Sequence, residues 1–239
     1  MKVLSIGNSF SQDAQRYLHE IAKNDGVDLF SVNLFIGGCS LETHYNNIVE
    51  NNANYSLEIN GKTTNTYTSI KDALLSEKWD YITLQQASPK SGDYSSYNPY
   101  IKDIYKYVKK LCPYAKILIH QTWAYEDKSQ KLFTTPYKSA DEMYNAIKNA
   151  YSKCFSDLDF DGLIPSGKAM INAIKLGIEK IHRDSLHASL GAGRYLLGLV
   201  WYKYLTCNDV SNNSFDLLDE PITENEREIV IKAVNDACN

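Results

Sequence analysis

The sequence lacks the features that define several common protein classes. No apolar run approaches the about 18 residues that a membrane span needs, so we expect no membrane association. No stretch is rich in Lys and Arg, and the formal charge of −4 argues against nucleic acid as a partner. The phosphate and dinucleotide motifs G-x-x-x-x-G-K-[ST] and G-x-G-x-x-G are absent. Their absence argues against an NTPase or a nicotinamide enzyme, and we expect no cofactor.

The sequence also has no paired cysteine motif. Its 5 cysteines are scattered without a CxxC pair, which favours reduced thiols over a disulfide framework or a zinc ribbon. The first segment, MKVLSIGNSF, has an apolar run that breaks after Ile6 and is too short for a signal peptide. Both observations predict a cytoplasmic protein, or an exported one if a leader has been removed.

Short apolar segments alternate with helical patterns along the chain. Hydrophobic residues make up 44% and charged residues 23%, as in an average globular protein. Strands are predicted at residues 3–6, 29–36, 79–85, 116–121 and 162–165. Helices are predicted at residues 14–22, 41–50, 69–78, 100–111, 140–155, 168–181, 191–205 and 224–238. This alternation predicts an α/β protein with three α/β/α layers around a mainly parallel central sheet. No linker divides the chain, so we expect one domain over residues 1–239.

One segment departs from this alternation. Asn60-Gly61 lies between two extended segments, and this dipeptide is a strong signal for a tight hairpin turn. The sequence therefore predicts a β-hairpin insertion near residues 55–67.

A serine follows the first predicted strand. Ligands of a parallel sheet bind beyond the carboxyl ends of its strands, and Gly7-Asn8-Ser9-Phe10 occupies such an end. At a helix N-terminus, free backbone N–H groups would favour negative charge beside Ser9, as acyl transfer requires. Alternatively, Ser9 or Ser11 is simply a helix cap.

A second polar motif comes late in the chain, at Asp184-Ser-Leu-His187. A serine nucleophile needs an imidazole to take its proton, and that imidazole needs an acceptor on its other nitrogen. His187 and Asp184 can supply both groups from one loop. The alternatives are an ordinary polar loop, or a metal site formed by His182, Asp184 and His187.

Four blocks in this order resemble the SGNH (GDSL-type) hydrolase superfamily, in a bacterial branch. They are Gly7-Asn8-Ser9-Phe10, Ile36-Gly37-Gly38-Cys39-Ser40, Leu84-Gln85-Gln86-Ala87-Ser88 and Asp184-Ser-Leu-His187. The resemblance spans nearly the whole chain and implies the flavodoxin-like SGNH hydrolase fold. It implies a catalytic triad of Ser9, His187 and Asp184.

The resemblance also implies an oxyanion hole, formed by the Ser9 and Gly38 N–H groups and a third amide. Two positions depart from the family pattern: Asn8 replaces Asp, and Gln85-Gln86 replaces the Asn of the third block. Carbohydrate acetylesterases of the sialate O-acetylesterase type look similar in placing Gln there. We assign Gln86 to the oxyanion hole, although the strand register could exchange it with Gln85.

Aromatic residues after the fourth strand complete the predicted site. Trp123 and Tyr125 could stack on a sugar, or could simply pack, and we assign them with Gln85 to substrate binding. The resulting hypothesis is a serine esterase that removes short acyl groups, acetyl above all, from a small-molecule or glycan ester. The alternatives are a metal-dependent hydrolase and a non-catalytic carbohydrate-binding module. The sequence does not indicate an oligomeric state.

Overall fold

The computed structural model describes residues 1–239 and contains one seven-stranded sheet. Its strand order is β4-β3-β2-β1-β5-β6-β7. The strands are β1 (Lys2–Gly7), β2 (Phe30–Phe35), β3 (Tyr55–Ile59), β4 (Lys62–Thr68), β5 (Tyr81–Leu84), β6 (Lys116–His120) and β7 (Gly162–Ile164). Neighbouring strands pair in parallel along β2-β1-β5-β6-β7. At one edge of the sheet, β3 pairs antiparallel with β2, and β4 pairs antiparallel with β3. The predicted mainly parallel sheet is confirmed.

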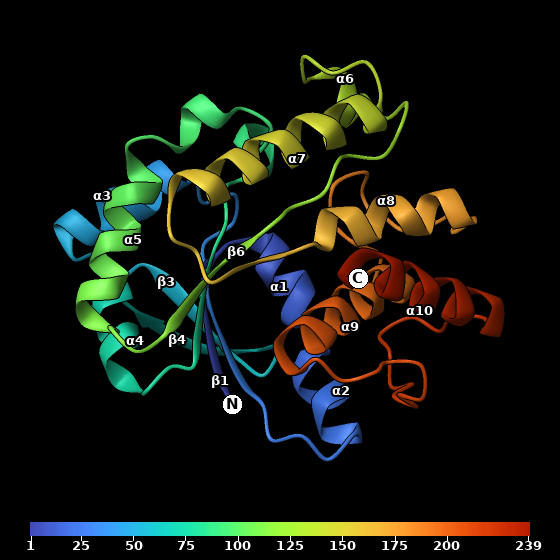
Figure 1. Ribbon diagram of the computed structural model, residues 1–239, viewed down its shortest axis with the longest axis horizontal. Helices are drawn as coiled ribbons and strands as arrows, with labels where there is room; N and C mark the ends of the chain where they lie inside the picture. Colours follow the sequence, from blue (N-terminus) through green and yellow to red (C-terminus); the bar gives the residue numbers. More distant parts are fainter.

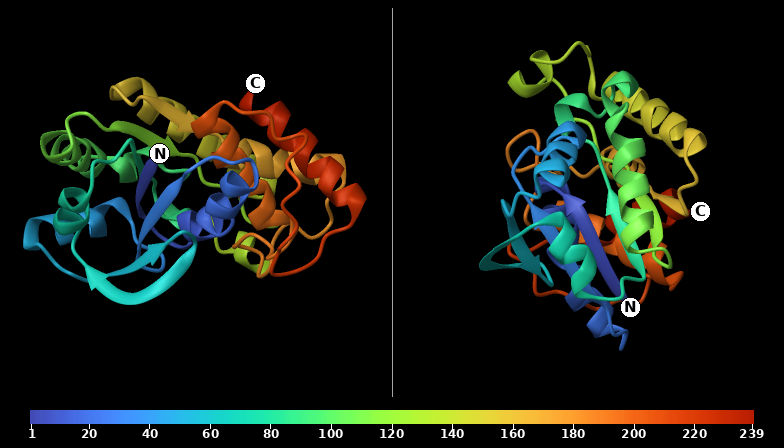
Figure 2. Two further views of the ribbon diagram at one scale, coloured as in Figure 1. Left: turned by 90° about the horizontal axis from the view of Figure 1, so that it is seen from below. Right: turned by 90° about the vertical axis from the view of Figure 1, so that its left-hand side faces the viewer.

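Helices cover both faces of this sheet, and Figures 1 and 2 show the three layers. One face carries α3 (Leu41–Glu50), α4 (Ile70–Ser76), α5 (Tyr100–Leu111) and α7 (Ala140–Asp157); the other carries α1 (Ser9–Gln15), α2 (Leu18–Asn24), α8 (Ser166–Leu176), α9 (Ala192–Thr206) and α10 (Glu224–Cys238). Alternation along β1 places Val3 in the core on the α9 side and Leu4 in the core on the α5 side. None of these helices has the length and apolar character that crossing a membrane requires.

The predicted hairpin is present as β3 and β4. Asn60 and Gly61 both have positive φ, at 49° and 74°, which is the conformation that a two-residue hairpin turn requires. Because β3 pairs antiparallel with β2, the hairpin extends the edge of the central sheet.

Two helical predictions were inaccurate, and three short helices were not predicted. The helix predicted at residues 14–22 is two helices, and the first of them begins at Ser9. The helix predicted at residues 168–181 ends at Leu176, because Gly177 adopts a left-handed conformation with φ of 108°. Short helices were missed at α6 (Gln130–Phe133), η1 (Ser88–Lys90) and η2 (Tyr94–Tyr97).

The start of α1 was missed because one face of this helix packs on polar groups. Ser11 donates its hydroxyl to Asn33 Oδ1 at 2.8 Å, and Gln15 Nε2 donates to Ser5 Oγ at 2.5 Å. Ser5 Oγ in turn lies 2.7 Å from Thr83 Oγ1 on the neighbouring strand. Hydrogen bonds therefore replace the apolar periodicity that marks most amphipathic helices.

Candidate active site

Three strand ends bring the predicted site together. Ile6 of β1 pairs with Leu84 of β5, and Leu84 pairs with Ile119 of β6. The next residues, Gly7, Gln85 and His120, therefore lie beside one another at the carboxyl edge of the sheet. The sequence predicted the functional site at this edge of the sheet.

The turn from β1 into α1 is fixed by Asn8. Asn8 caps α1, and its Oδ1 accepts a hydrogen bond from the Phe10 N–H at 3.0 Å. Ser11 completes a capping box by accepting from the Asn8 N–H at 3.0 Å. A Cβ at Gly7 would lie 1.9 Å from Ser11 Oγ, so only glycine fits before the cap. Ser9 thus occupies the first position of the helix.

The late polar motif is the tip of a short ribbon. His182 and Ala188 form an antiparallel bridge, and the Arg183 N–H donates to the His187 carbonyl at 2.9 Å. Ser185 takes positive φ, at 64°, to close the turn. Asp184 and His187 therefore project from one tight loop.

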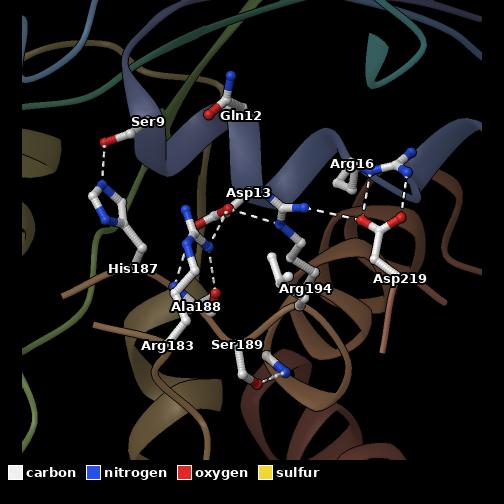
Figure 3. Close-up of polar contacts among 12 residues, drawn as sticks. Ser9, Gln12, Asp13, Arg16, Arg183, His187, Ala188, Ser189, Arg194 and Asp219 are labelled. Atoms are coloured by element: carbon white, nitrogen blue, oxygen red, sulfur yellow. Dashed lines mark hydrogen bonds and ion pairs between the residues drawn. The ribbon is translucent and has the colours of Figure 1, made fainter. Parts of the chain in front are cut away.

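The structure brings Ser9, His187 and Asp184 into one hydrogen-bonded chain. His187 Nε2 lies 2.9 Å from Ser9 Oγ, although these residues are 178 positions apart in the sequence (Figure 3). His187 Nδ1 lies 2.7 Å from Asp184 Oδ2. An acceptor on Nδ1 selects the tautomer whose Nε2 can take the serine proton. In this arrangement the imidazole of His187 can take a proton from Ser9 Oγ.

The Asp184 carboxyl is held as an acceptor. Burial acts to raise its pKa, but hydrogen bonds from the His187 N–H and imidazole outweigh burial and lower the pKa to about 2. The backbone N–H groups of His187 and Leu186 donate to Oδ1 at 2.7 and 3.2 Å. Asp184 is therefore ionised wherever the protein is folded near neutral pH.

The two aromatic residues assigned to substrate binding are buried instead. The Trp123 ring stacks on Phe10, with centroids 3.9 Å apart, and its Nε1 donates to the Leu186 carbonyl at 2.9 Å. Tyr125 lies with its hydroxyl 3.0 Å from Ser88 Oγ. Because Trp123 and Tyr125 are 0% and 1% exposed, neither offers a face to a sugar. Trp123 instead packs beneath Phe10 and supports the loop of Asp184 and His187 through its hydrogen bond to Leu186.

The oxyanion role assigned to Gln86 is also wrong. Gln86 is fully buried, and its Nε2 donates to the carbonyl and hydroxyl of Ser96, both at 3.1 Å. Its Oε1 accepts from the backbone N–H groups of Leu41 and Ala87. Both amide hydrogens are used, so none remains for a substrate. Strand alternation turns Gln86 toward the α5 side of the sheet.

Gln85 points toward Asn8. Its Nε2 donates to Asn8 Oδ1 at 2.6 Å, and its Oε1 lies 2.5 Å from His120 Nδ1. His120 Nε2 lies 2.9 Å from Ser166 Oγ, and burial lowers the pKa of His120 to about 3. A neutral His120 can donate to Gln85 and accept from Ser166. Gln85 and His120 are 1% and 0% exposed, so neither can contact a substrate. The substrate-binding role assigned to Gln85 is therefore wrong, because its amide is bonded to Asn8 and His120.

Two backbone N–H groups remain open at the site. Neither Ser9 nor Gly38 donates its N–H to any atom of the protein. Asn8 Nδ2 donates to the Cys39 carbonyl at 3.1 Å and so holds the Gly37–Cys39 turn against α1. Gly38 has φ of 65°, and a Cβ there would meet nothing within 4 Å. Its left-handed backbone, rather than crowding, favours glycine at this position.

The predicted metal alternative is not assembled. No three His, Cys, Asp or Glu side chains gather where they could hold an ion. His182 Nε2 lies 3.1 Å from the Ala124 carbonyl and is nearly buried. The ring nitrogens of His187 lie against Asp184 and Ser9 instead.

A polar hollow of about 580 Å³ is bordered by Asp184 and Ser185, next to His187 in the chain, although neither Ser9 nor His187 lines it. Its lining has no hydrophobic residue and comprises Glu126, Asp127, Lys128, Ser129, Gln130, Lys131, Thr134, Asp184 and Ser185. Ser185 donates its hydroxyl to Glu126 at 2.5 Å, which joins the segment before α6 to the loop of Asp184 and His187. A ligand in this hollow would meet both acidic and basic side chains, together with hydroxyl groups.

Comparison with known proteins places the whole chain in one family. Residues 2–237 match a domain family of unknown function, DUF4886. The chain belongs to the DUF4886 family. The crystal structure of a DUF4886 protein from Bacteroides uniformis is 36% identical, with a TM-score of 0.92 over 99% of this chain and 94% of that one. No curated protein matches this sequence.

More distant structures share the fold of this DUF4886 protein. A candidate SGNH hydrolase from Slackia heliotrinireducens is 22% identical, with a TM-score of 0.64 over 86% of this chain and 98% of that one. An acetyl xylan esterase is 17% identical, with a TM-score of 0.54 over 84% of this chain and 98% of that one. The predicted SGNH hydrolase fold is therefore confirmed.

Proposed function

We propose that this DUF4886 protein is a serine esterase that hydrolyses short acyl esters, acetyl above all, of a hydroxyl-rich alcohol such as a carbohydrate. The hydrogen-bonded chain from Ser9 Oγ through His187 to Asp184 carries the proposal. The two free N–H groups of Ser9 and Gly38 supply donors for a developing oxyanion. Gln86 has no part in this mechanism.

The reaction proceeds in two steps. Ser9 Oγ attacks the ester carbonyl while His187 Nε2 takes the hydroxyl proton, and the carbonyl oxygen becomes an oxyanion facing the two N–H groups. Collapse breaks the bond to the alcohol oxygen, which receives the proton from His187. Water then attacks the acyl-serine by the same route, releasing the acid and restoring Ser9.

The polar hollow supports the substrate class. A lining of charged and hydroxyl groups suits a hydroxylated alcohol better than a long acyl chain, which would need apolar contacts. An acetyl xylan esterase with the same fold shows that the fold accommodates such chemistry.

Hydrolysis of an aryl acetate tests the reaction. Ser9→Ala and His187→Ala should each abolish turnover, with a loss of at least about 1000-fold, and a chelator should change nothing. Ser156→Ala and His19→Ala are matched controls on helices away from the triad and should keep wild-type rates. Full activity in Ser9→Ala, or loss of activity with chelator, would refute the serine mechanism.

Acyl length and alcohol are tested separately. Aryl acetate should be hydrolysed faster than aryl octanoate, and acetylated xylo-oligosaccharide should release acetate. Replacement of Lys131 by Ala in the hollow should raise KM for the acetylated sugar but not for the aryl acetate. Equal KM values for wild type and variant on both substrates would remove the hollow from the proposal. Sugar binding without acetate release would favour a non-catalytic carbohydrate-binding module.

A further inference from the structure

A buried carboxylate joins the helix of Ser9 to the loop of His187. Asp13 lies one turn after Ser9 in α1, and it is 0% exposed. Figure 3 shows that Ser9 and Asp13 face the same side of α1, toward the segment that carries His187 and Ala188. One short helix therefore contacts that segment at two points.

The hydrogen bonds to Asp13 come from the catalytic ribbon and from α9. The Ala188 N–H donates to Oδ2 at 3.0 Å, directly after His187 in the chain. Arg183 Nη1 donates to Oδ1 and Oδ2 at 2.9 and 3.0 Å, directly before Asp184. Arg194 Nε donates to Oδ1 at 2.9 Å. Asp13 thus holds both ends of the Asp184–His187 loop.

A second carboxylate extends the cluster outward. Arg194 Nη1 lies 3.0 Å from Asp219 Oδ2, and Asp219 also pairs with Arg16 at 2.5 Å. Arg16 lies directly after α1, and its hydrogen bonds go to Asp219 rather than to the catalytic ribbon. It therefore belongs to the same ion cluster without touching the groups that flank His187.

We propose that Asp13 is a positioning residue that sets the distance between Ser9 and His187, an inference that rests on the proposed esterase function. Removing the carboxylate would leave the guanidinium groups of Arg183 and Arg194 facing each other without the charge between them. The ribbon would move away from α1, and His187 would move with Ala188. A displacement of about 1 Å in a catalytic group can cost about 100-fold in rate.

The sequence carries a partial signal for this role. Asp13 is four residues after Ser9, a spacing that places two side chains on one helix face, and Arg183 is adjacent to Asp184. The pairing of Asp13 with Arg183 joins residues 170 positions apart, and spacing along the chain does not reveal such a contact.

The test compares Asp13→Asn, Arg183→Gln and Arg16→Gln, measuring kcat and KM for an aryl acetate and solving each crystal structure. In Asp13→Asn an NH₂ group replaces one carboxylate oxygen, so its hydrogens would face donors such as the Ala188 N–H and the Arg183 guanidinium instead of accepting from them. We expect Asp13→Asn and Arg183→Gln to lower kcat about 10- to 100-fold with KM within about twofold, and to lengthen the distance from Ser9 Oγ to His187 Nε2. Arg16→Gln should change none of these quantities.

Three results would overturn the inference. The first is wild-type kcat in folded Arg183→Gln, which decides the matter if Asp13→Asn does not fold. The second is an intact Ser9–His187 hydrogen bond in the crystal structure of a variant with lowered kcat. The third is a fall in kcat in Arg16→Gln as large as the fall in Asp13→Asn. If the wild type hydrolyses no ester, the proposed function fails, and the Ser9–His187 distance in the variant structures still decides the positioning role.

Discussion

Asn8 donates its side-chain N–H to the Cys39 carbonyl at 3.1 Å, a hydrogen bond that an aspartate in its place could not make. The Oδ1 of the same side chain accepts from the Phe10 N–H and from Gln85 Nε2. An amide offers a donor and an acceptor, whereas a carboxylate offers only acceptors. Asn8 therefore joins α1 to the Gly38 turn through a hydrogen bond that requires the amide.

Replacing Asn8 by Asp should weaken this junction. The Cys39 carbonyl would lose its donor and face a carboxylate, which we expect to lower the free energy of unfolding by about 1–3 kcal/mol. The rate of ester hydrolysis should fall as the Gly38 turn moves. Urea unfolding and aryl acetate kinetics measure both effects. Asn235→Asp is the control, since Asn235 accepts a hydrogen bond from Lys203 through Oδ1, which Asp keeps. An Asn8→Asp protein as stable and as fast as wild type would contradict the assigned role.

The sequence was most informative where apolar periodicity and turn chemistry agree. The strands with Val3, Ile82 and Ile117 are buried on both faces, so short, mostly apolar runs identified them. Asn60-Gly61 predicted the hairpin correctly, because few other dipeptides adopt positive φ twice. The start of α1 was mistaken because the inner face of this helix packs on hydroxyl and amide groups, which periodicity does not detect.

The sequence predicted which motifs gather at the candidate site, but not the direction in which each side chain points. Ser9, Asp184 and His187 could be found because each chemistry-bearing motif follows a structural signal, a strand end or a tight loop. Gln85 and Gln86 could not be told apart, since a one-residue change of register exchanges the two faces of a strand. Trp123 was misassigned because position after a strand does not reveal what covers a side chain.

Trp123→Phe tests whether Trp123 positions the loop or binds substrate. The change keeps an aromatic ring against Phe10 but leaves the Leu186 carbonyl without its donor. We expect kcat to fall about 3- to 10-fold with KM unchanged. A substrate-stacking Trp123 would instead raise KM. Trp79→Phe is a matched control, because Trp79 is also buried and its Nε1 also donates to a backbone carbonyl, that of Ala73 at 3.0 Å, before the start of β5. It should lose stability from the smaller ring but keep its kcat.

The low pKa of Asp184 makes a definite prediction about pH. Its folded value of about 2 is below the ordinary value of 3.8, so the unfolded chain binds a proton first as pH falls. The stabilisation from this group is therefore complete above about pH 4 and is lost as pH falls toward about 2. Melting temperatures of wild type and Asp184→Asn should differ most above about pH 4 and converge below it. A difference that stays constant from about pH 5 down to about pH 2 would contradict the assignment.

The activity of Asp184→Asn separates orientation from charge. Asn can donate to His187 Nδ1 and so favour the tautomer whose Nε2 cannot take the serine proton. We expect kcat to fall by about 10⁴, with a well-folded protein near neutral pH. In wild type, Asp184 stays ionised above about pH 4, so any change of rate with pH above that value must come from another group. Aryl acetate kinetics between about pH 5 and 9 measure both effects.

Gly38→Ala isolates the backbone donor proposed for the oxyanion. Gly38 and Gly26 have nearly the same positive φ, 65° and 71°, and a Cβ at either meets no atom within 4 Å. An alanine at each position should therefore carry the same backbone strain and lower the free energy of unfolding by a similar amount, about 1 kcal/mol. Only at position 38 would relief of that strain rotate a free N–H away from the carbonyl oxygen of a substrate. We expect Gly38→Ala to lower kcat about 10- to 100-fold and Gly26→Ala to leave it at the wild-type value, since losing an oxyanion donor raises the barrier of the chemical step. Equal kcat values in the two variants would mean that the Gly38 N–H takes no part in stabilising the transition state.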